Sequence, residues 1–175
     1  MKIDADVLLP EDVHTMNTKD RFIKKLDYDD IELAKEVPIV VRYDYIDLKD
    51  TAYHFKQEFT HDDTIGYFSR MKEFSGKSVQ TLLDAIDPKT KRNKYHFYKN
   101  TPRGQLLYSL KKCLPHADVS NLIVFHFALY DTTTRADRKA GTRNSRVYFV
   151  LGTYGHIYIL FFDPYHELNP DKKTV

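Results

Sequence analysis

The sequence predicts an α+β fold with a mainly antiparallel sheet, about three helices packed on one face and a C-terminal β-hairpin in the core. A β-rich stretch comes first, three segments with helical spacing of apolar residues follow, and the remainder is again β-rich. Strands, then helices, then an antiparallel meander are typical of an α+β domain. A chain of 175 residues with 42% apolar residues can bury one core. We therefore expect a single domain over residues 31–175, preceded by a loosely structured segment over residues 1–30.

The first β segment is expected over residues 37–47, where β-branched and aromatic residues outweigh Pro38. Residues 53–59 alternate in polarity and predict a second strand. The period then changes to that of a helix. Thr60 or Asp62 can cap a helix that ends near Gly76. Its predicted apolar face consists of Ile65, Phe68 and Met71.

Two more helices follow. Ser78 caps the second, whose apolar residues Val79, Leu82, Leu83 and Ile86 keep helical spacing up to Asp87-Pro88. Asn100 or Thr101 caps the third, with Pro102 in its first turn and Pro115 beyond its end. The apolar stripe of the third helix consists of Leu106, Leu107, Leu110, Cys113 and Leu114.

The rest of the chain predicts three strands. Residues 121–130 are apolar on both sides of the strand alternation, which indicates a buried strand. Residues 147–152 and 156–162 predict a hairpin, because Gly155 can supply the positive φ that closes a three-residue loop. After it, we expect Asp163 to cap a short C-terminal helix that has Pro164 at its first position.

Composition excludes several classes of protein. The net charge of +2 does not by itself demand a polyanionic partner, and the single Cys113 excludes an internal disulfide. No apolar run approaches the roughly 18 residues of a membrane span, and residues 1–10 lack the apolar core of a signal peptide. We expect a cytoplasmic protein without a membrane partner. Dinucleotide, P-loop and serine-hydrolase motifs are absent, so no cofactor is predicted.

The order of several aromatic segments is similar to that of small uncharacterised prokaryotic proteins. These segments are 67–75, 82–84, Tyr95-His96, 147–151 and 158–166, the last of which ends in Asp163-Pro-Tyr-His166. The resemblance covers about residues 52–170 and rests on an aromatic strand followed by Asp-x-x-His and a proline. It implies a prokaryotic or phage-related origin and no particular activity.

Two basic segments favour a nucleic-acid partner. Residues 88–103 carry six Lys or Arg and no acid, interleaved with three aromatic residues, and residues 131–146 add five more basic residues. Cations meet phosphates while aromatic faces stack on bases, a pattern typical of proteins that bind RNA or single-stranded DNA. The alternative is a pair of solvated loops. The predicted nucleic-acid ligands are Lys91, Arg92, Lys94, Arg135, Arg138, Arg143 and Arg146.

The predicted catalytic residues are His96, Tyr98 and Arg103, because a metal-independent ribonuclease needs a proton-transfer group and a cation near the phosphate. Nearby positive charge favours the neutral imidazole that a general base requires. The RelE-like and barnase-like toxins share the expected layout of helices on an antiparallel sheet. The competing interpretation of each histidine, His126 and His156 included, is structural.

Asp163 and His166, together with His126 or His156, are the candidate metal ligands of the sequence. Their spacing matches no zinc motif and there is no second acidic cluster, so we predict no metal site. The sequence leaves open whether the protein is an enzyme. The leading hypothesis is a nucleic-acid-interacting protein, such as a ribonuclease-like toxin or phage-defence element. The alternative is a non-enzymatic protein-protein interaction module that exposes part of its 14% aromatic residues.

Overall fold

A computed structural model describes residues 33–46, 53, 55, 58–115, 118–130 and 143–169. Short 3-10 turns cover Val119–Asn121 and Thr153–Gly155. No helix in these ranges is long and apolar enough to cross a membrane. In chain order the strands and α-helices are β1 (Val40–Arg42), α2 (His61–Phe74), α3 (Val79–Leu83), β2 (Tyr98–Asn100), α4 (Gly104–Cys113), β3 (Val124–Ala128), β4 (Arg146–Leu151) and β5 (His156–Asp163).

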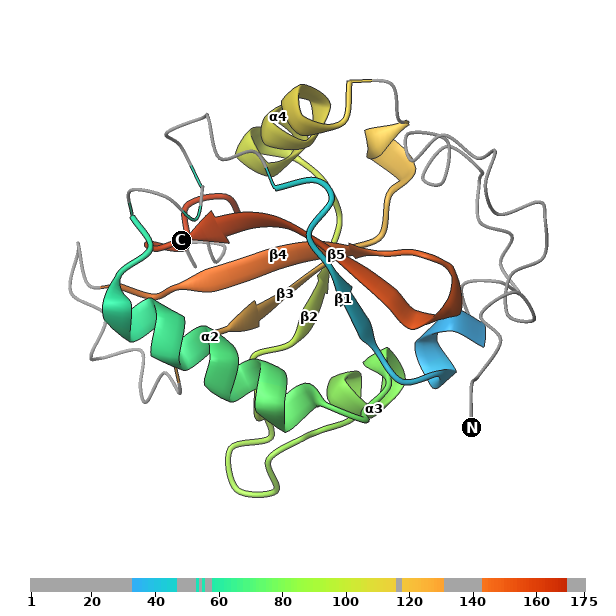
Figure 1. The fold of residues 1–175 in the computed structure, drawn as a ribbon, viewed down its shortest axis with the longest axis vertical. Helices are drawn as coiled ribbons and strands as arrows, with labels where there is room; N and C mark the ends of the chain where they lie inside the picture. The colour runs from blue at the N-terminus through green and yellow to red at the C-terminus, as the bar shows by residue number, and fades with distance from the viewer. Residues whose placement is uncertain are drawn as a thin grey trace, which may run out of the picture.

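The strands form one sheet in the order β1-β5-β4-β3-β2 (Figure 1). Strands β2 to β5 pair antiparallel, and only β1 runs parallel to its neighbour β5. The β4 and β5 hairpin occupies the middle of the sheet and its residues are almost all buried. The α+β class, the mainly antiparallel sheet and the central C-terminal hairpin are therefore confirmed.

The turn of this hairpin requires glycine at position 155. Gly155 has φ +70°, and a Cβ there would lie 2.7 Å from both the Pro38 carbonyl oxygen and the Val37 side chain. Any larger residue would be strained in its backbone and would push against the segment that leads into β1. Gly155 thus supplies the positive φ that was predicted for this turn, and its close packing against residues 37 and 38 is a second reason for glycine.

Helices cover both faces of the sheet instead of one, which corrects the predicted arrangement (Figure 1). Residues of α2 and α3 share a core with Phe125, Phe127 and Phe149. Leucines of α4 share a second core with Tyr148 and Leu160. Because β3 and β4 are buried along their whole length, each face of the sheet needs a covering layer.

The inward face of α2 also differs from the predicted one. Ile65 and Phe68 are 54% and 64% exposed, whereas the buried residues are Asp63, Tyr67, Arg70 and Phe74. Positions 67, 70 and 74 have helical spacing too, but the arginine hid this stripe from a search for apolar residues. Arg70 is buried because its Nε donates to the Ala128 carbonyl at 3.0 Å and its guanidinium lies over the Tyr95 ring.

Helix caps follow the predictions in two cases of three. Thr60 and Asp63 form a capping box at the start of α2, and Ser78 accepts from the backbone of Thr81 at the start of α3. The N-cap of α4 is Arg103, which makes no capping hydrogen bond with its side chain, rather than Asn100 or Thr101. The Asn100 side chain contacts His126 instead.

Strand boundaries differ from the predictions at the sheet edges. The segment 37–47 contributes only three residues to β1, and the described residues among 53–59 lie outside any strand. Tyr98–Asn100 forms the edge strand β2, which the basic character of the segment concealed. Asp163 caps backbone N–H groups as predicted, but the residues that follow, as far as 169, form bends instead of a helix.

Candidate functional site

Polar aromatic side chains line up across the α4 side of the sheet. In the strand register Tyr98 of β2 lies opposite His126 of β3, and His126 lies opposite Tyr148 of β4. The ring centroids of Tyr98 and His126 are 5.7 Å apart, and those of His126 and Tyr148 are 5.2 Å apart. Side chains directly opposite one another point to the same face. The row therefore lies on the face that α4 covers.

Two more histidines adjoin this row, His96 at its Tyr98 end and His166 beside its middle member, His126. The ring of His166, just beyond β5, lies 5.6 Å from that of His126. The ring of His96, just before β2, lies 6.2 Å from that of Tyr98. We call the set of His96, Tyr98, His126, Tyr148 and His166 the histidine cluster. It combines three imidazoles and two phenols from four separate segments of the chain.

The backbone is strained at both outer histidines. His96 has φ +49° and His166 has φ +60°, in the left-handed region that non-glycine residues rarely occupy. Such positions cost roughly 1 to 3 kcal/mol each and occur preferentially at functional sites. Both of these imidazoles are thus held at an energetic cost.

A β-bulge places charged residues beside the cluster. Tyr148 lies opposite Phe161 while Phe149 lies opposite Ile159, so Leu160 is an extra residue in β5. Beyond the bulge Asp163 lies opposite Arg146, two residues along β4 from Tyr148. Arg146 and Asp163 are both buried. The bulge therefore brings the Asp163 carboxylate to the same end of the sheet as the histidine cluster.

Hydrogen bonds fix the central imidazole. The side chain of Asn100 contacts His126 Nδ1, with the amide nitrogen 2.9 Å and the amide oxygen 3.2 Å away. Asn169 donates to the Asn100 oxygen at 2.6 Å. Nδ1 accepts from the Asn100 amide nitrogen in one tautomer of His126 and donates to the amide oxygen in the other, and the Asn169 bond is compatible with both because an amide oxygen can accept twice.

Electrostatics keep His126 neutral. Burial, and then the charges of Arg146, His166 and His96, lower the pKa of His126 well below its usual range. Burial also raises the pKa of Asp163, although three backbone N–H groups, of Tyr165, Glu167 and Leu168, hydrogen-bond its carboxylate and act in the opposite direction. The cluster therefore combines a neutral imidazole at its base with a guanidinium charge nearby.

The outer members of the cluster reach the surface. Tyr98 is 38% exposed, and His96 and His166 are half-buried, whereas His126 and Tyr148 are buried. A ligand could contact the first three side chains without unfolding the sheet. Among the residues that the structure describes, no group of three His, Cys, Asp or Glu side chains could hold a metal ion.

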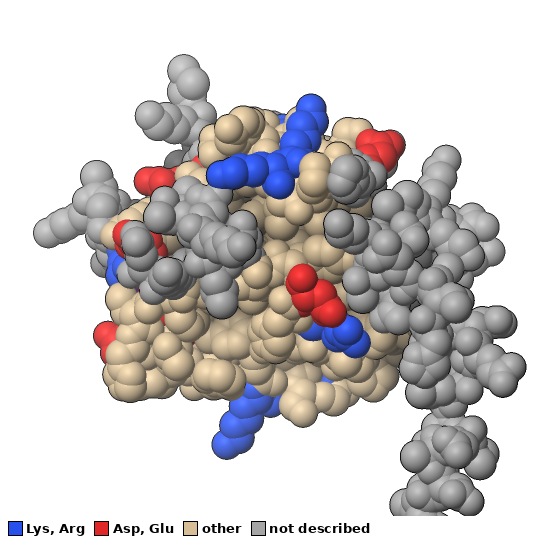
Figure 2. Space-filling view, turned by 45° about the horizontal axis from the view of Figure 1, so that its top comes forward, with Lys and Arg blue, Asp and Glu red and all other residues tan. Residues whose placement is uncertain are grey.

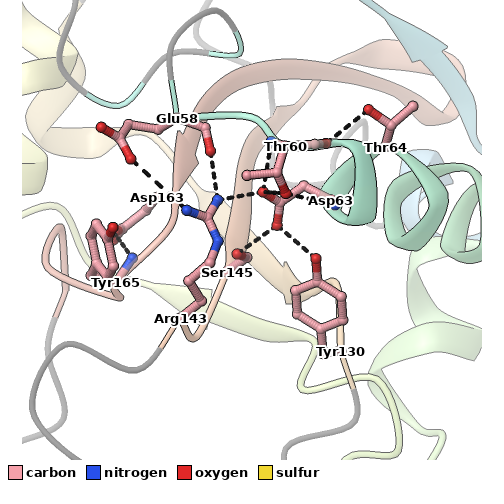
Figure 3. Close-up of polar contacts among 9 residues, drawn as sticks. All are labelled: Glu58, Thr60, Asp63, Thr64, Tyr130, Arg143, Ser145, Asp163 and Tyr165. Atoms are coloured by element: carbon pink, nitrogen blue, oxygen red, sulfur yellow. Dashed lines mark hydrogen bonds and ion pairs between the residues drawn. The ribbon is translucent and has the colours of Figure 1, made fainter.

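A second polar cluster lies at the start of α2 (Figure 3). The buried carboxylate of Asp63 accepts from the Thr60 N–H and hydroxyl, at 2.9 and 2.8 Å, and from the Tyr130 and Ser145 hydroxyls, at 2.8 and 2.9 Å. It also pairs with Arg143. Burial alone would raise the pKa of Asp63, but these hydrogen bonds outweigh it and the pKa lies below its usual value. We call this set the Asp63 network.

The Asp63 network has a structural role. Its carboxylate joins α2 to the end of β3 through Tyr130 and to the start of β4 through Ser145. All the donors come from the chain itself and surround a fully buried group. Arg143, predicted as a nucleic-acid ligand, is engaged here and also donates to the Glu58 carbonyl.

Four other basic residues that the sequence predicts as site residues lie in different segments of the chain from Arg143. Lys91, Arg92 and Lys94 are exposed in the segment between α3 and β2, and Arg103 is exposed at the start of α4. Lys94 lies over the ring of Tyr95, which packs on Phe74 at the far end of α2 from Asp63. Eleven residues of helix, about 16 Å, separate Asp63 from Phe74. Lys94 and Arg143 therefore belong to opposite ends of α2.

The structure describes only some of the predicted nucleic-acid ligands. Arg135 and Arg138 lie outside the described residues, and Arg146 is buried, with hydrogen bonds to the Asn144 and Ser145 carbonyls. On the face drawn in Figure 2 blue side chains gather at the top, and others lie apart from them near the centre and at the lower edge. Of the predicted nucleic-acid ligands, the exposed ones among the described residues are thus Lys91, Arg92 and Lys94.

Of the predicted catalytic set, the structure brings His96 and Tyr98 together. Arg103 follows Asn100, the partner of His126, by three residues, but no contact joins it to the cluster. Sequence reasoning did not place His126, Tyr148 and His166 in the site. An imidazole inside an otherwise apolar strand was the available signal for His126.

No protein-family model, curated protein or solved structure matches this chain.

Proposed function

We propose that this protein is a nucleic-acid-interacting protein that cleaves RNA without a metal ion, in the manner of a ribonuclease-like toxin or phage-defence element. Its prokaryotic or phage-related origin and cytoplasmic location are parts of the same proposal. The observation that carries it is the histidine cluster, in which partly exposed His96 and His166 flank Tyr98 and the buried His126. Three imidazoles beside a guanidinium form a set suited to proton transfer next to a phosphate.

In this proposal His96 and His166 are the proton-transfer pair. One imidazole takes the proton of a ribose 2′-hydroxyl while the 2′-oxygen attacks the phosphorus. The bond from phosphorus to the 5′-oxygen breaks, and the other imidazole, as imidazolium, gives that oxygen a proton. The products are a 2′,3′-cyclic phosphate and a 5′-hydroxyl. Tyr98 lies at the surface beside the pair, and Arg103 supplies a cation for the phosphate.

His126 acts in this proposal as a positioning residue. Its neutral imidazole, held by Asn100, supports the rings of Tyr98 and His166 from below. Arg146 contributes positive charge from within the sheet, since its charge acts on His126. Single-stranded RNA is the substrate that fits best, because DNA has no 2′-hydroxyl for the attack.

Cleavage of a labelled single-stranded RNA in excess chelator tests the proposal. We expect His96→Ala and His166→Ala each to lower the rate about 100-fold or more, the usual contribution of a general acid or base, with little change in melting temperature. Each loss should remove one limb of the bell-shaped pH dependence. His61→Ala, which alters an exposed histidine of α2, is the matched control. A double variant that retains the wild-type rate, or a strict need for a divalent metal, would refute the proposal.

A non-enzymatic protein-protein interaction module is the second candidate. It is favoured by the exposed side of α2, where Ile65 and Phe68 project, and by the half-exposed Tyr43, which hydrogen-bonds Tyr67. Large apolar side chains in such positions are typical of contact surfaces. A wild-type protein that neither cleaves nor binds RNA would favour this candidate.

A further inference from the structure

The chain has one long stretch without a single acidic residue. Between Asp87 and Asp118 there are eight Lys or Arg and no Asp or Glu, although the whole chain has 25 acidic residues and a net charge of only +2. This stretch includes the segment before β2, β2 itself and the whole of α4. Positive charge is therefore concentrated on the elements that build and cover one side of the histidine cluster.

Helix α4 divides sharply into two sides. Leu106, Leu110 and the adjoining Leu114 are buried in the core above β4 and β5. On the opposite side Tyr108, Lys111 and Lys112 are exposed. Lys111 and Lys112 follow Tyr108 by three and four residues, so all three lie together on one face of the helix. Tyr108 is 65% exposed, among the most exposed of the large hydrophobic side chains described.

This side of α4 is visible in the space-filling view. The blue side chains at the top of Figure 2 lie over α4 and adjoin one another, with no acidic side chain between them. Arg103, also exposed, stands at the start of the same helix. The face therefore presents an aromatic ring with cations beside it and a further cation at one end.

The position of α4 relative to the cluster is fixed by Asn100. Its side chain contacts His126, and Arg103 follows three residues later, within about 10 Å of extended chain. Tyr108 lies five residues further, about one and a half helical turns. An extended ligand on α4 would thus reach the cluster from the start of the helix.

We propose that Arg103, Tyr108, Lys111 and Lys112 form the single-stranded RNA-binding surface of this protein, with Tyr108 stacking on a base and the cations contacting phosphates. Cations beside an exposed aromatic ring are the combination by which single strands are bound without sequence preference. The inference rests on the proposed function and specifies where its substrate binds. It replaces the loop residues Arg143 and Arg146 as the main phosphate ligands, since both are engaged within the fold.

Binding is measured separately from cleavage with an uncleavable probe. A fluorescent 2′-O-methyl RNA of about 16 nucleotides without secondary structure is titrated with the full chain, and its anisotropy is followed over a salt series. We expect Lys111→Gln/Lys112→Gln to raise Kd about tenfold at 0.1 M salt and to reduce the log-log salt slope by about 1.4, which corresponds to two phosphate contacts on a single strand. Tyr108→Ala should weaken binding about 5- to 150-fold, and Tyr108→Phe should bind like the wild type.

The matched control is Lys72→Gln. Lys72 is an exposed lysine in the last turn of α2, so it complements a helix dipole as Lys111 and Lys112 do, but it lies on the other side of the sheet. It should leave Kd unchanged. Equal weakening by Lys72→Gln would overturn the inference, as would a double variant with wild-type Kd and slope. Displacement of the probe by poly-glutamate at equal charge, with Tyr108→Ala without effect, would indicate an acidic protein ligand and would overturn it as well.

Cleavage of unmodified RNA, assayed in parallel, separates the two proposals. If the α4 variants lose binding while the wild type cleaves nothing, the surface stands and the proposed reaction fails. If the wild type cleaves RNA and the α4 variants bind and cleave as it does, the reaction stands and the surface is refuted. Melting temperatures of the variants, all at exposed positions, confirm that the fold is intact.

Discussion

The two faces of the sheet carry different kinds of side chain, although the same strands supply both. Towards α2 and α3 the strands β3 to β5 present only apolar residues, with Phe125, Phe127 and Phe149 at the centre. Towards α4 they present leucine and valine at one end and His126, Arg146 and Asp163 at the other. The strand alternation thus separates an apolar core from a polar one within a single sheet.

The two faces differ in the energetic cost of the side chains that they bury. On the α2 side the strands bury aromatic rings, and the buried charges there, Asp63 and Arg70, belong to the helix and not to the sheet. On the α4 side buried imidazole, guanidinium and carboxylate groups require hydrogen bonds, and the backbone is strained at His96 and His166. Buried polar groups and strained backbone lower the stability of the fold, and proteins keep them mainly where the groups serve a function. The comparison supports the histidine cluster as the functional end of the sheet.

The largest loss of stability is expected when a buried aromatic ring is removed from the apolar face. Phe149→Ala should lower the free energy of unfolding by about 3 to 5 kcal/mol, because a fully buried ring leaves a cavity between the sheet and α2. Tyr148→Phe, at the next residue and on the opposite face, should cost no more than about 1.5 kcal/mol. Urea melts of the two variants measure both values. Equal losses would contradict the division of roles between the faces.

A smaller loss is expected from the Asp63 network, the buried charge on the α2 side. Asp63→Asn should cost about 2 to 3 kcal/mol, because Arg143 loses its charged partner and several donors lose a charged acceptor. Glu58→Gln is the control, since its ion pair with Arg143 is 3.9 Å long and exposed, and it should cost less than about 0.5 kcal/mol.

Acid unfolding checks the same carboxylate. The pKa of Asp63 is lower in the folded protein than its usual 3.8, so its contribution to stability is complete above that pH and is lost as the pH falls through the folded value. Asp63→Asn should therefore lose less stability than the wild type below about pH 4. Parallel acid titrations of the two proteins would contradict a buried, ionised Asp63.

The polar face should respond to pH in a different window. His126 has a lowered pKa in the fold, so below its unfolded value of 6.5 the unfolded chain binds a proton that the folded protein does not. Stability should fall from about pH 6.5 downwards by at most about 1.4 kcal/mol per pH unit. His126→Gln should remove this component, while the contribution of Asp163 stays common to both proteins. Urea midpoints at pH 7.5, 6 and 5 measure the difference, and equal slopes would contradict a neutral His126.

The sequence predicted the elements whose apolar pattern is continuous. The hairpin of β4 and β5 and the inward leucines of α4 were found because each repeats a single period. The inward side of α2 was missed because Arg70 interrupts it and because Ile65 and Phe68 form a more apolar stripe on the exposed side. Local pattern cannot decide which of two stripes meets the sheet.

The histidine cluster could be predicted only in its parts. His96 and Tyr98 are neighbours in sequence, but His126, Tyr148 and His166 join them through strand register. The bulge at Leu160, which sets the position of Asp163, has no signal in a run of apolar residues. Register depends on pairing between distant segments, so a site built across four of them requires the fold.

The smallest effect is expected on the outer side of α2. Phe68 is 64% exposed and contacts the Tyr67 ring, so Phe68→Ser should change the free energy of unfolding by no more than about 0.5 kcal/mol. Phe74, six residues along the same helix, is fully buried, and Phe74→Ala should cost about 3 to 5 kcal/mol. Urea melts at two protein concentrations decide the point. A loss above about 1 kcal/mol at Phe68 that grows with protein concentration would mean that another copy covers this side, because association with the folded state adds stability in proportion to the logarithm of concentration.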